Sequence, residues 1–137
     1  MTEAEAHGPR ERPLSPHVSI WRWHITMATS IAHRFTGVGL YVGALIAAAW
    51  AVSLASGPEA YGTFKALLGS PLGKFVMFGL TVSALYHLAN GMRHLIWDAG
   101  HGLDVKSINA QSFAIFGFTA AATVAVWVVA ALTGALS

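Results

Sequence analysis

Four residues near the end of an apolar run have types and spacings that could do chemistry together. They are His87, Gly91, His94 and Asp98, within the stretch YHLANGMRHLIWDAG at residues 86–100. In an α-helix these spacings place all four on one face. At a rise of about 1.5 Å per residue, His94 is expected roughly 10 Å nearer than His87 to the end of the run. If this run crosses a membrane, His87 lies inside the hydrocarbon region.

Three interpretations of His87 remain open from this segment alone. An unsatisfied polar group in lipid costs several kcal/mol, so the imidazole needs a partner. It can hydrogen-bond to a neighbouring helix, ligate a haem iron as neutral imidazole, or relay protons. Gly91, one turn further on, favours haem because it clears space for a flat macrocycle. Glycine also serves ordinary helix packing, so the other two interpretations stay open.

A second group of residues lies at the start of the first apolar run. In SIAHRFTG, residues Ser30, His33, Arg34 and Gly37 share one helix face. An arginine at a membrane edge can extend its guanidinium to lipid phosphates. Arg34 and His33 can instead hold haem propionates. Ser30 and Arg34 can hydrogen-bond a quinone oxygen and stabilise charge as the quinone is reduced.

Asp98, at the end of the second run, has two possible roles. Asp98 can form an ion pair with Arg93 or Arg34, or take part in proton delivery.

His33 lies just outside its apolar run and His87 about six residues inside the other, which predicts depths that differ by roughly 10 Å. That difference is too large for both to be axial ligands of one haem. If two imidazoles bind the iron, the second must come from another subunit.

The elements that must position these groups are three long apolar runs. A membrane-spanning helix needs about 20 apolar residues, and each run has about that length. We expect helices at about residues 27–56, 70–97 and 109–136, with a short interfacial helix between the first two. The fold class is therefore all-α: an integral membrane protein whose three transmembrane helices form part of a heteromeric helix bundle. Residues 1–26 are expected to form an inside-facing arm, and residues 27–137 the transmembrane anchor domain.

Small residues indicate where partner helices pack. The stretches GVGLYVGA and TAAATVAV let helices approach closely in lipid. Three such helices are a poor self-contained unit, so partner subunits and membrane lipid are the expected surroundings.

The composition excludes several classes of protein. The chain has 137 residues, of which 55% are hydrophobic and 10% charged, against about 25% charged in soluble domains. A net charge of +2 gives no indication of a nucleic-acid partner. The chain has no cysteine, which excludes disulfides, thiolate zinc sites and iron–sulfur ligation by its own side chains.

The distribution of lysine and arginine predicts the orientation. Two of the eight lie on the side of the connection between the first two helices, and the other six on the opposite side. Basic residues favour the inner side, so the N-terminus is expected inside, in cytoplasm or mitochondrial matrix. The six are Arg10, Arg12, Arg22, Arg34, Arg93 and Lys106.

Two segments, taken together, resemble a known family. RPLSPHVSIWRWHITMATSIAHRFT at residues 12–36 resembles the N-terminal signature of the cytochrome b membrane-anchor subunit of succinate dehydrogenase. HLANGMRHLIWDAG at residues 87–100 resembles the second signature of that family. The resemblance covers nearly the whole chain apart from the first ten residues. One small departure is Trp21, at a position where tyrosine is frequent.

The resemblance implies a role for each matching residue. His87 matches the axial ligand of haem b, whose other ligand comes from the second, smaller membrane-anchor subunit. Ser30 and Arg34 match quinone-site positions, and His33 a position near the haem propionates. His94 is expected near the propionates as well, with Gly91 making room for the haem, and Asp98 matches an acidic residue at the quinone end.

The expected function follows from this resemblance. The chain is expected to be a membrane anchor of succinate:quinone oxidoreductase in the bacterial inner (cytoplasmic) membrane, with the mitochondrial inner membrane as the second choice. Electrons from succinate would pass through a flavoprotein and an iron–sulfur subunit to ubiquinone, and this chain alone would not be catalytic. Two alternatives remain: the anchor of a fumarate reductase that uses menaquinol, and a non-redox membrane protein with a proton-relay histidine.

Overall fold

The computed structural model describes residues 20–136, and this part of the chain is helical without strands. The helices are α1 (Ile25–Ala55), α2 (Pro58–Gly69), α3 (Pro71–Asp98) and α4 (Val105–Leu132). Within the described residues, α1, α3 and α4 are long and apolar enough to cross a membrane. The predicted all-α membrane fold with three spanning helices is thus confirmed. Most of the predicted N-terminal arm, up to residue 19, lies outside the described residues.

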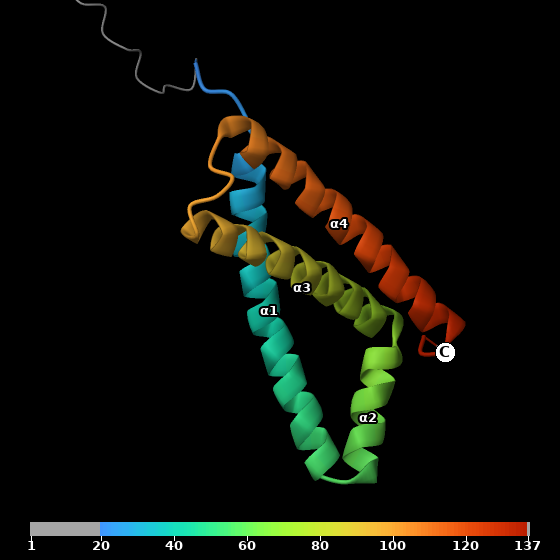
Figure 1. Cartoon of the computed structure of the whole chain (residues 1–137). Coiled ribbons are helices and arrows are strands. Elements are labelled where there is room, and N and C mark those ends of the chain that lie inside the picture. Colours follow the sequence, from blue (N-terminus) through green and yellow to red (C-terminus); the bar gives the residue numbers. More distant parts are fainter. Residues whose placement is uncertain (1–19, 137) are drawn as a thin grey trace, which may run out of the picture.

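The arrangement of the helices brings three helix ends together (Figure 1). α1 crosses α3, and α4 returns alongside α3 in the opposite direction. The start of α1, the end of α3 and the start of α4 therefore lie at one end of the molecule. The short α2 connects the far end of α1 to the start of α3. The sequence expectation of a short helix between the first two long ones is met by α2.

Local sequence explains where the helices begin. Ser70 caps α3, because its hydroxyl accepts a hydrogen bond from the amide of Gly73 at 3.0 Å. Pro58 and Pro71 stand at the first turns of α2 and α3, where a missing N–H costs nothing. Between α1 and α2 the chain turns at Gly57, whose φ of 105° is unfavourable for a side-chain-bearing residue.

The last helix differs from its predicted bounds by four residues at each end. Residues 109–136 were expected, whereas α4 spans Val105–Leu132. It starts early because the Asp104 carboxylate caps it, accepting from the Ser107 amide at 2.9 Å. It ends early, at Leu132, because the chain leaves the helical conformation at Gly134, which has a φ of 73°. The first helix starts at Ile25, so residues 25–26, assigned to the arm, belong to α1.

Close contacts between α1 and α3 depend on glycine. A Cβ added to Gly39 would lie 2.8 Å from the Ser83 hydroxyl oxygen, and one added to Gly43 would lie 3.1 Å from a Leu80 methyl carbon. These glycines let the two helix backbones approach closely. Two of the small residues expected to face partner helices therefore serve a contact within the chain. Most large apolar side chains remain exposed, as expected for a surface that meets lipid or other subunits.

Candidate functional site

The ring of His87 lies against α1. Its Nδ1 is 3.2 Å from the hydroxyl oxygen of Thr36, and that hydroxyl also lies 3.0 Å from the carbonyl oxygen of His33. A Cβ on Gly37 would lie 3.4 Å from Cε1 of His87. His87 is half-buried. The polar partner that an intramembrane histidine needs is therefore supplied by α1.

The ring of His33 stacks on the ring of His87. Their centroids are 3.9 Å apart and their planes differ by 11°. The predicted difference of roughly 10 Å in depth is therefore wrong. It took the depth of His33 from its place just outside the apolar run, whereas His33 lies two turns inside α1, which begins at Ile25. The crossing of α1 and α3 brings both rings to one level.

His94, two turns after His87 on α3, extends the same cluster. Its ring centroid lies 5.4 Å from that of His33, and its Nε2 lies 3.4 Å from the side-chain nitrogen of Asn90. Nδ1 of His33 and Oδ1 of Asn90 are buried without a hydrogen-bond partner in the described structure. Residues 20–136 contain no group of three His, Cys, Asp or Glu side chains that could hold a metal ion. The cluster therefore offers single imidazoles rather than a multidentate metal site.

A small hollow opens beside the histidines, where α1 meets the end of α3. Three of its lining residues, Ser30, Arg34 and His94, have exposed side chains. Asp98 is exposed too but does not line the hollow. An added Cβ at Gly91 would meet no atom within 4 Å, so the space beside that residue is open. The hollow is lined by Thr26, Ser30, His33, Arg34, Arg93, His94 and Trp97.

Sequence reasoning missed Arg93, which was counted only as an orienting charge and a partner for Asp98. Arg93 is 4% exposed. Its guanidinium donates to Ser112 on α4 at 2.9 Å and to Thr29 on α1 at 3.0 Å. It also lies 4.5 Å from the centre of the Trp97 ring, a cation–π contact. The signal was present, since an arginine followed four residues later by tryptophan shares a helix face with it.

The same end of the molecule is tied together by tyrosine and tryptophan. The hydroxyl of Tyr86 donates to the Thr29 carbonyl at 2.8 Å, and Nε1 of Trp97 donates to Gln111 at 3.1 Å. These bonds join α1, α3 and α4 directly behind the histidine cluster. The cluster therefore stands on a cross-linked frame rather than on one free helix.

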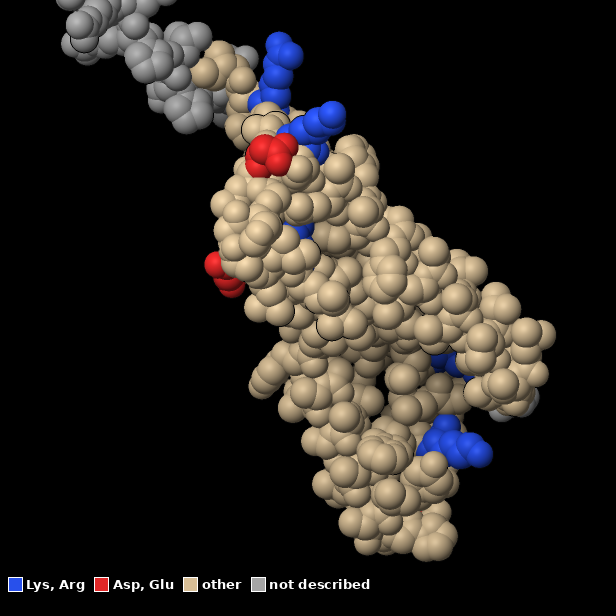
Figure 2. All heavy atoms as spheres, in the orientation of Figure 1, with Lys and Arg blue, Asp and Glu red and all other residues tan. Residues whose placement is uncertain are grey.

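On the face shown in Figure 2, lysine and arginine side chains lie toward the two ends of the molecule, and the surface between them is largely uncharged. Lys65 and Lys74 belong to α2 and the start of α3, and Arg22 and Lys106 flank the starts of α1 and α4. This separation agrees with the basis of the predicted orientation, which stays a prediction.

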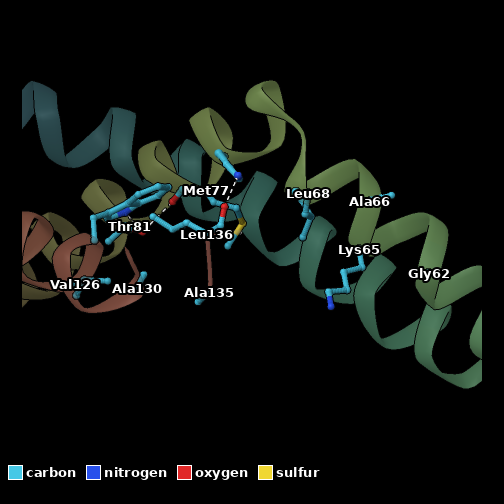
Figure 3. A pocket seen from close by; sticks show the side chains of 13 residues that line it. Gly62, Lys65, Ala66, Leu68, Met77, Thr81, Val126, Ala130, Ala135 and Leu136 are labelled. Atoms are coloured by element: carbon cyan, nitrogen blue, oxygen red, sulfur yellow. Dashed lines mark hydrogen bonds between the residues drawn. The ribbon is translucent and has the colours of Figure 1, made fainter. Parts of the chain in front are cut away.

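A larger hollow lies near the junction of α2 and α3, away from the histidines (Figure 3). The end of α4 forms its other wall, where Nε1 of Trp127 donates to Thr81 at 3.3 Å. The ammonium group of Lys74 donates to the carbonyl of Leu136. The predicted site residues do not line this hollow. The candidate functional site is therefore the smaller hollow beside the histidines, at the other end of the molecule.

The fold and the site define a class: a multi-pass helical membrane protein with a polar histidine cluster between two of its spanning helices. Comparison with known proteins gives the family. Residues 8–126 match the family described as the succinate dehydrogenase/fumarate reductase transmembrane subunit. The chain belongs to this family.

Individual relatives agree with that assignment. The chain is 38% identical over 115 residues to the mitochondrial succinate dehydrogenase cytochrome b560 subunit of Sus scrofa, covering 82% of this chain and 68% of the relative. It is 33% identical over 128 residues to the succinate dehydrogenase cytochrome b556 subunit of Rickettsia felis, covering 93% and 100%. The corresponding subunit of Paracoccus denitrificans is 36% identical over 104 residues, covering 76% and 80%. The resemblance stated from the sequence is confirmed.

Proposed function

We propose that this chain is one of two membrane anchors of a succinate:quinone oxidoreductase. It binds haem b jointly with the second anchor and forms part of the site that reduces ubiquinone. The observation that carries this proposal is the position of His33. Its ring stacks on His87 and also lines the hollow that contains Ser30 and Arg34. The proposed haem ligand and the proposed quinone-binding groups are therefore adjacent.

The residues around His87 fit a haem. Ligation uses the in-plane lone pair of an imidazole nitrogen, and His33 covers only the face of the ring, so the stack does not obstruct it. The buried Nδ1 of His33 lacks a partner in the described structure, and a propionate carboxylate would satisfy it. Arg34 and His94 add donors nearby, and Gly91 leaves open space. When bound, haem b supplies one-electron chemistry.

Only one axial ligand is proposed from this chain. If two imidazoles held one haem iron from its two sides, their rings would have to leave room for the macrocycle between them. The rings of His33 and His87 are 3.9 Å apart and stacked, which leaves no such space. The second ligand therefore comes from the other anchor subunit.

The quinone would bind in the hollow at the start of α1. The hydroxyl of Ser30 donates to a quinone oxygen, and the guanidinium of Arg34 stabilises negative charge as electrons arrive. Both side chains are exposed and lie one turn apart on α1. Asp98 is exposed at the end of α3, close to Trp97 in sequence, and is proposed to deliver protons toward this site.

The remaining partners follow from the assembly. Electrons come from a flavoprotein through an iron–sulfur subunit, which docks on the inner face near the quinone site. The chain itself supplies hydrogen bonds, charge and a haem ligand rather than the oxidation of succinate. We place it in the bacterial cytoplasmic membrane with its N-terminus in the cytoplasm. Because α1 begins at Ile25, the anchor domain in this proposal starts at residue 25 rather than at residue 27.

The test is a dithionite-reduced minus oxidised spectrum of the complex purified through this chain. Wild type is compared with His87→Ala and with His101→Ala, a matched control because His101 is exposed in the α3–α4 connection. We expect a low-spin b-type signal that is lost or strongly reduced only in His87→Ala. An undiminished signal in His87→Ala contradicts the ligand assignment.

The direction of the reaction needs a separate assay, because the family description covers both succinate dehydrogenase and fumarate reductase. We expect succinate-driven ubiquinone reduction to exceed menaquinol-driven fumarate reduction. The opposite ranking favours the fumarate reductase alternative. A purified complex with neither activity and no haem favours the non-redox alternative.

A further inference from the structure

Thr36 on α1 is joined to His87 on α3 by a hydrogen bond. We propose that Thr36 is a positioning residue that selects Nε2 of His87 as the haem ligand and lowers the reduction potential of that haem. The inference deepens the proposed function and rests on it, since it requires His87 to bind haem. Thr36 belongs neither to the proposed quinone site nor to the proposed propionate contacts.

The Thr36 hydroxyl has one hydrogen and two neighbours, the His33 carbonyl oxygen at 3.0 Å and Nδ1 of His87 at 3.2 Å. A carbonyl oxygen can only accept, so the hydroxyl hydrogen satisfies it, as is common for threonine within a helix. The hydroxyl lone pair is then free to accept from Nδ1–H of His87. Both contacts are satisfied only when His87 carries its hydrogen on Nδ1.

With the hydrogen on Nδ1, the lone pair of neutral imidazole is on Nε2, the atom that a metal would take. Gly37 supports the same orientation, because a Cβ there would lie 3.4 Å from Cε1 and 3.9 Å from Nδ1. The Nδ1–Cε1 edge of the ring therefore faces α1. Residues 33–37 of α1 therefore fix the position of the His87 ring. His33 covers its face, Gly37 lies against its Nδ1–Cε1 edge, and Thr36 contacts its Nδ1.

An imidazole that donates Nδ1–H to an acceptor is a more basic ligand, and a more basic ligand favours the oxidised metal. The Thr36 hydroxyl therefore lowers the reduction potential of the haem. Replacing it by a methyl group removes the acceptor and leaves Nδ1–H unpaired at nearly the same side-chain volume.

The experiment compares Thr36→Val with Thr36→Ser in the intact complex. The control is Thr63→Val, because Thr63 is exposed on α2 and bonds only its own helix at Glu59. Three quantities are measured: haem per complex, the midpoint potential by redox titration, and the low-spin signal of the oxidised haem by electron paramagnetic resonance. We expect a more positive potential and an altered low-spin signal in Thr36→Val. Thr36→Ser and Thr63→Val should match wild type.

Each other outcome has a defined meaning. Loss of haem in Thr36→Val but not in Thr36→Ser also supports the inference, because serine keeps the hydroxyl that valine lacks, although it loses the methyl group that valine keeps. An unchanged potential and spectrum in Thr36→Val overturns it. Loss of haem in both variants overturns it as well, because packing rather than the hydroxyl would then be decisive. His87→Ala measured alongside separates the two proposals: if it keeps its haem, the ligand assignment itself has failed.

Discussion

The imidazole rings of His33 and His87 lie parallel, 3.9 Å apart between centroids, although they come from different helices. His33 belongs to the hollow that contains Ser30 and Arg34, and His87 contacts Thr36 on the same helix as His33. The stack therefore links the proposed haem side of the site to the proposed quinone side. Any change in the crossing of α1 and α3 would disturb both together.

Replacing His33 by alanine should leave the haem six-coordinate. Under the proposed function the two axial ligands are His87 and a histidine of the second anchor, so the loss of His33 removes neither of them. The reduced minus oxidised spectrum of His33→Ala should keep its low-spin form, with some loss of haem because a propionate contact is missing. A conversion to high spin would instead make His33 a ligand.

Removing the Asp104 cap should weaken the start of α4. Hydrogen bonds from the side chain and then the backbone of Ser107 hold the pKa of the Asp104 carboxyl below its usual value. A pKa that is lower in the folded state gives stability that is present above the unfolded pKa. That stability is lost as the pH falls through the lowered value.

Hydrogen exchange at the Ser107 amide measures this effect. At neutral pH the exchange should be faster in Asp104→Ala than in wild type, and Asp104→Asn should retain most of the protection. Equal exchange rates in Asp104→Ala and wild type would mean that the cap does not hold this turn.

Adding one methyl group to Gly39 should loosen the contact between α1 and α3. Its Cβ would lie 2.8 Å from the Ser83 hydroxyl oxygen and 3.4 Å from the Ser83 Cβ, so the hydroxyl must turn away or the two helices must separate slightly. The matched control is Gly79→Ala, because a Cβ there meets no atom within 4 Å. Alanine is the better helix former by about 0.5–1 kcal/mol, so Gly79→Ala should be neutral or stabilising. Thermal unfolding of the purified complex should show opposite signs for the two; a shared sign would contradict the proposed contact.

The sequence predicts the long helices well because the ability of a segment to span a membrane depends on its own length and apolar composition. A charge-free run of sufficient length identifies each spanning helix, and α1 and α3 lie within two residues of their predicted bounds. The start of α4 was predicted four residues late, although aspartate followed three residues on by serine was a readable capping signal. Hydropathy alone does not detect a cap.

The site was predictable only within each helix. Helical periodicity places His87, Gly91 and His94 on one face, and Ser30 and Arg34 on another. The relative depth of His33 and His87 depends on how α1 and α3 cross, which contacts distant in sequence decide, such as that between Gly39 and Ser83.

Replacing Arg93 by methionine should destabilise the frame behind the site. The guanidinium hydrogen-bonds Thr29 on α1 and Ser112 on α4, so its loss removes hydrogen bonds that connect α3 to both of these helices. Both hydroxyls keep bonds to their own helices, so the cost should be about 1–3 kcal/mol rather than complete misfolding. Thermal unfolding of Arg93→Met should begin at lower temperature, with Lys106→Met as control because Lys106 is exposed. Unchanged unfolding would mean that the bonds of Arg93 contribute nothing to the frame.

Replacing Arg34 by alanine should separate quinone reduction from succinate oxidation. If its guanidinium stabilises charge on the reduced quinone, losing a charged hydrogen bond of about 1.5–3 kcal/mol lowers the rate roughly ten- to a hundred-fold. Succinate oxidation with a soluble dye acceptor bypasses the membrane site and should persist in Arg34→Ala. Arg22→Ala is the matched control, since Arg22 is an exposed arginine ahead of α1. Equal loss of both activities in Arg34→Ala would mean that the residue supports assembly rather than quinone chemistry.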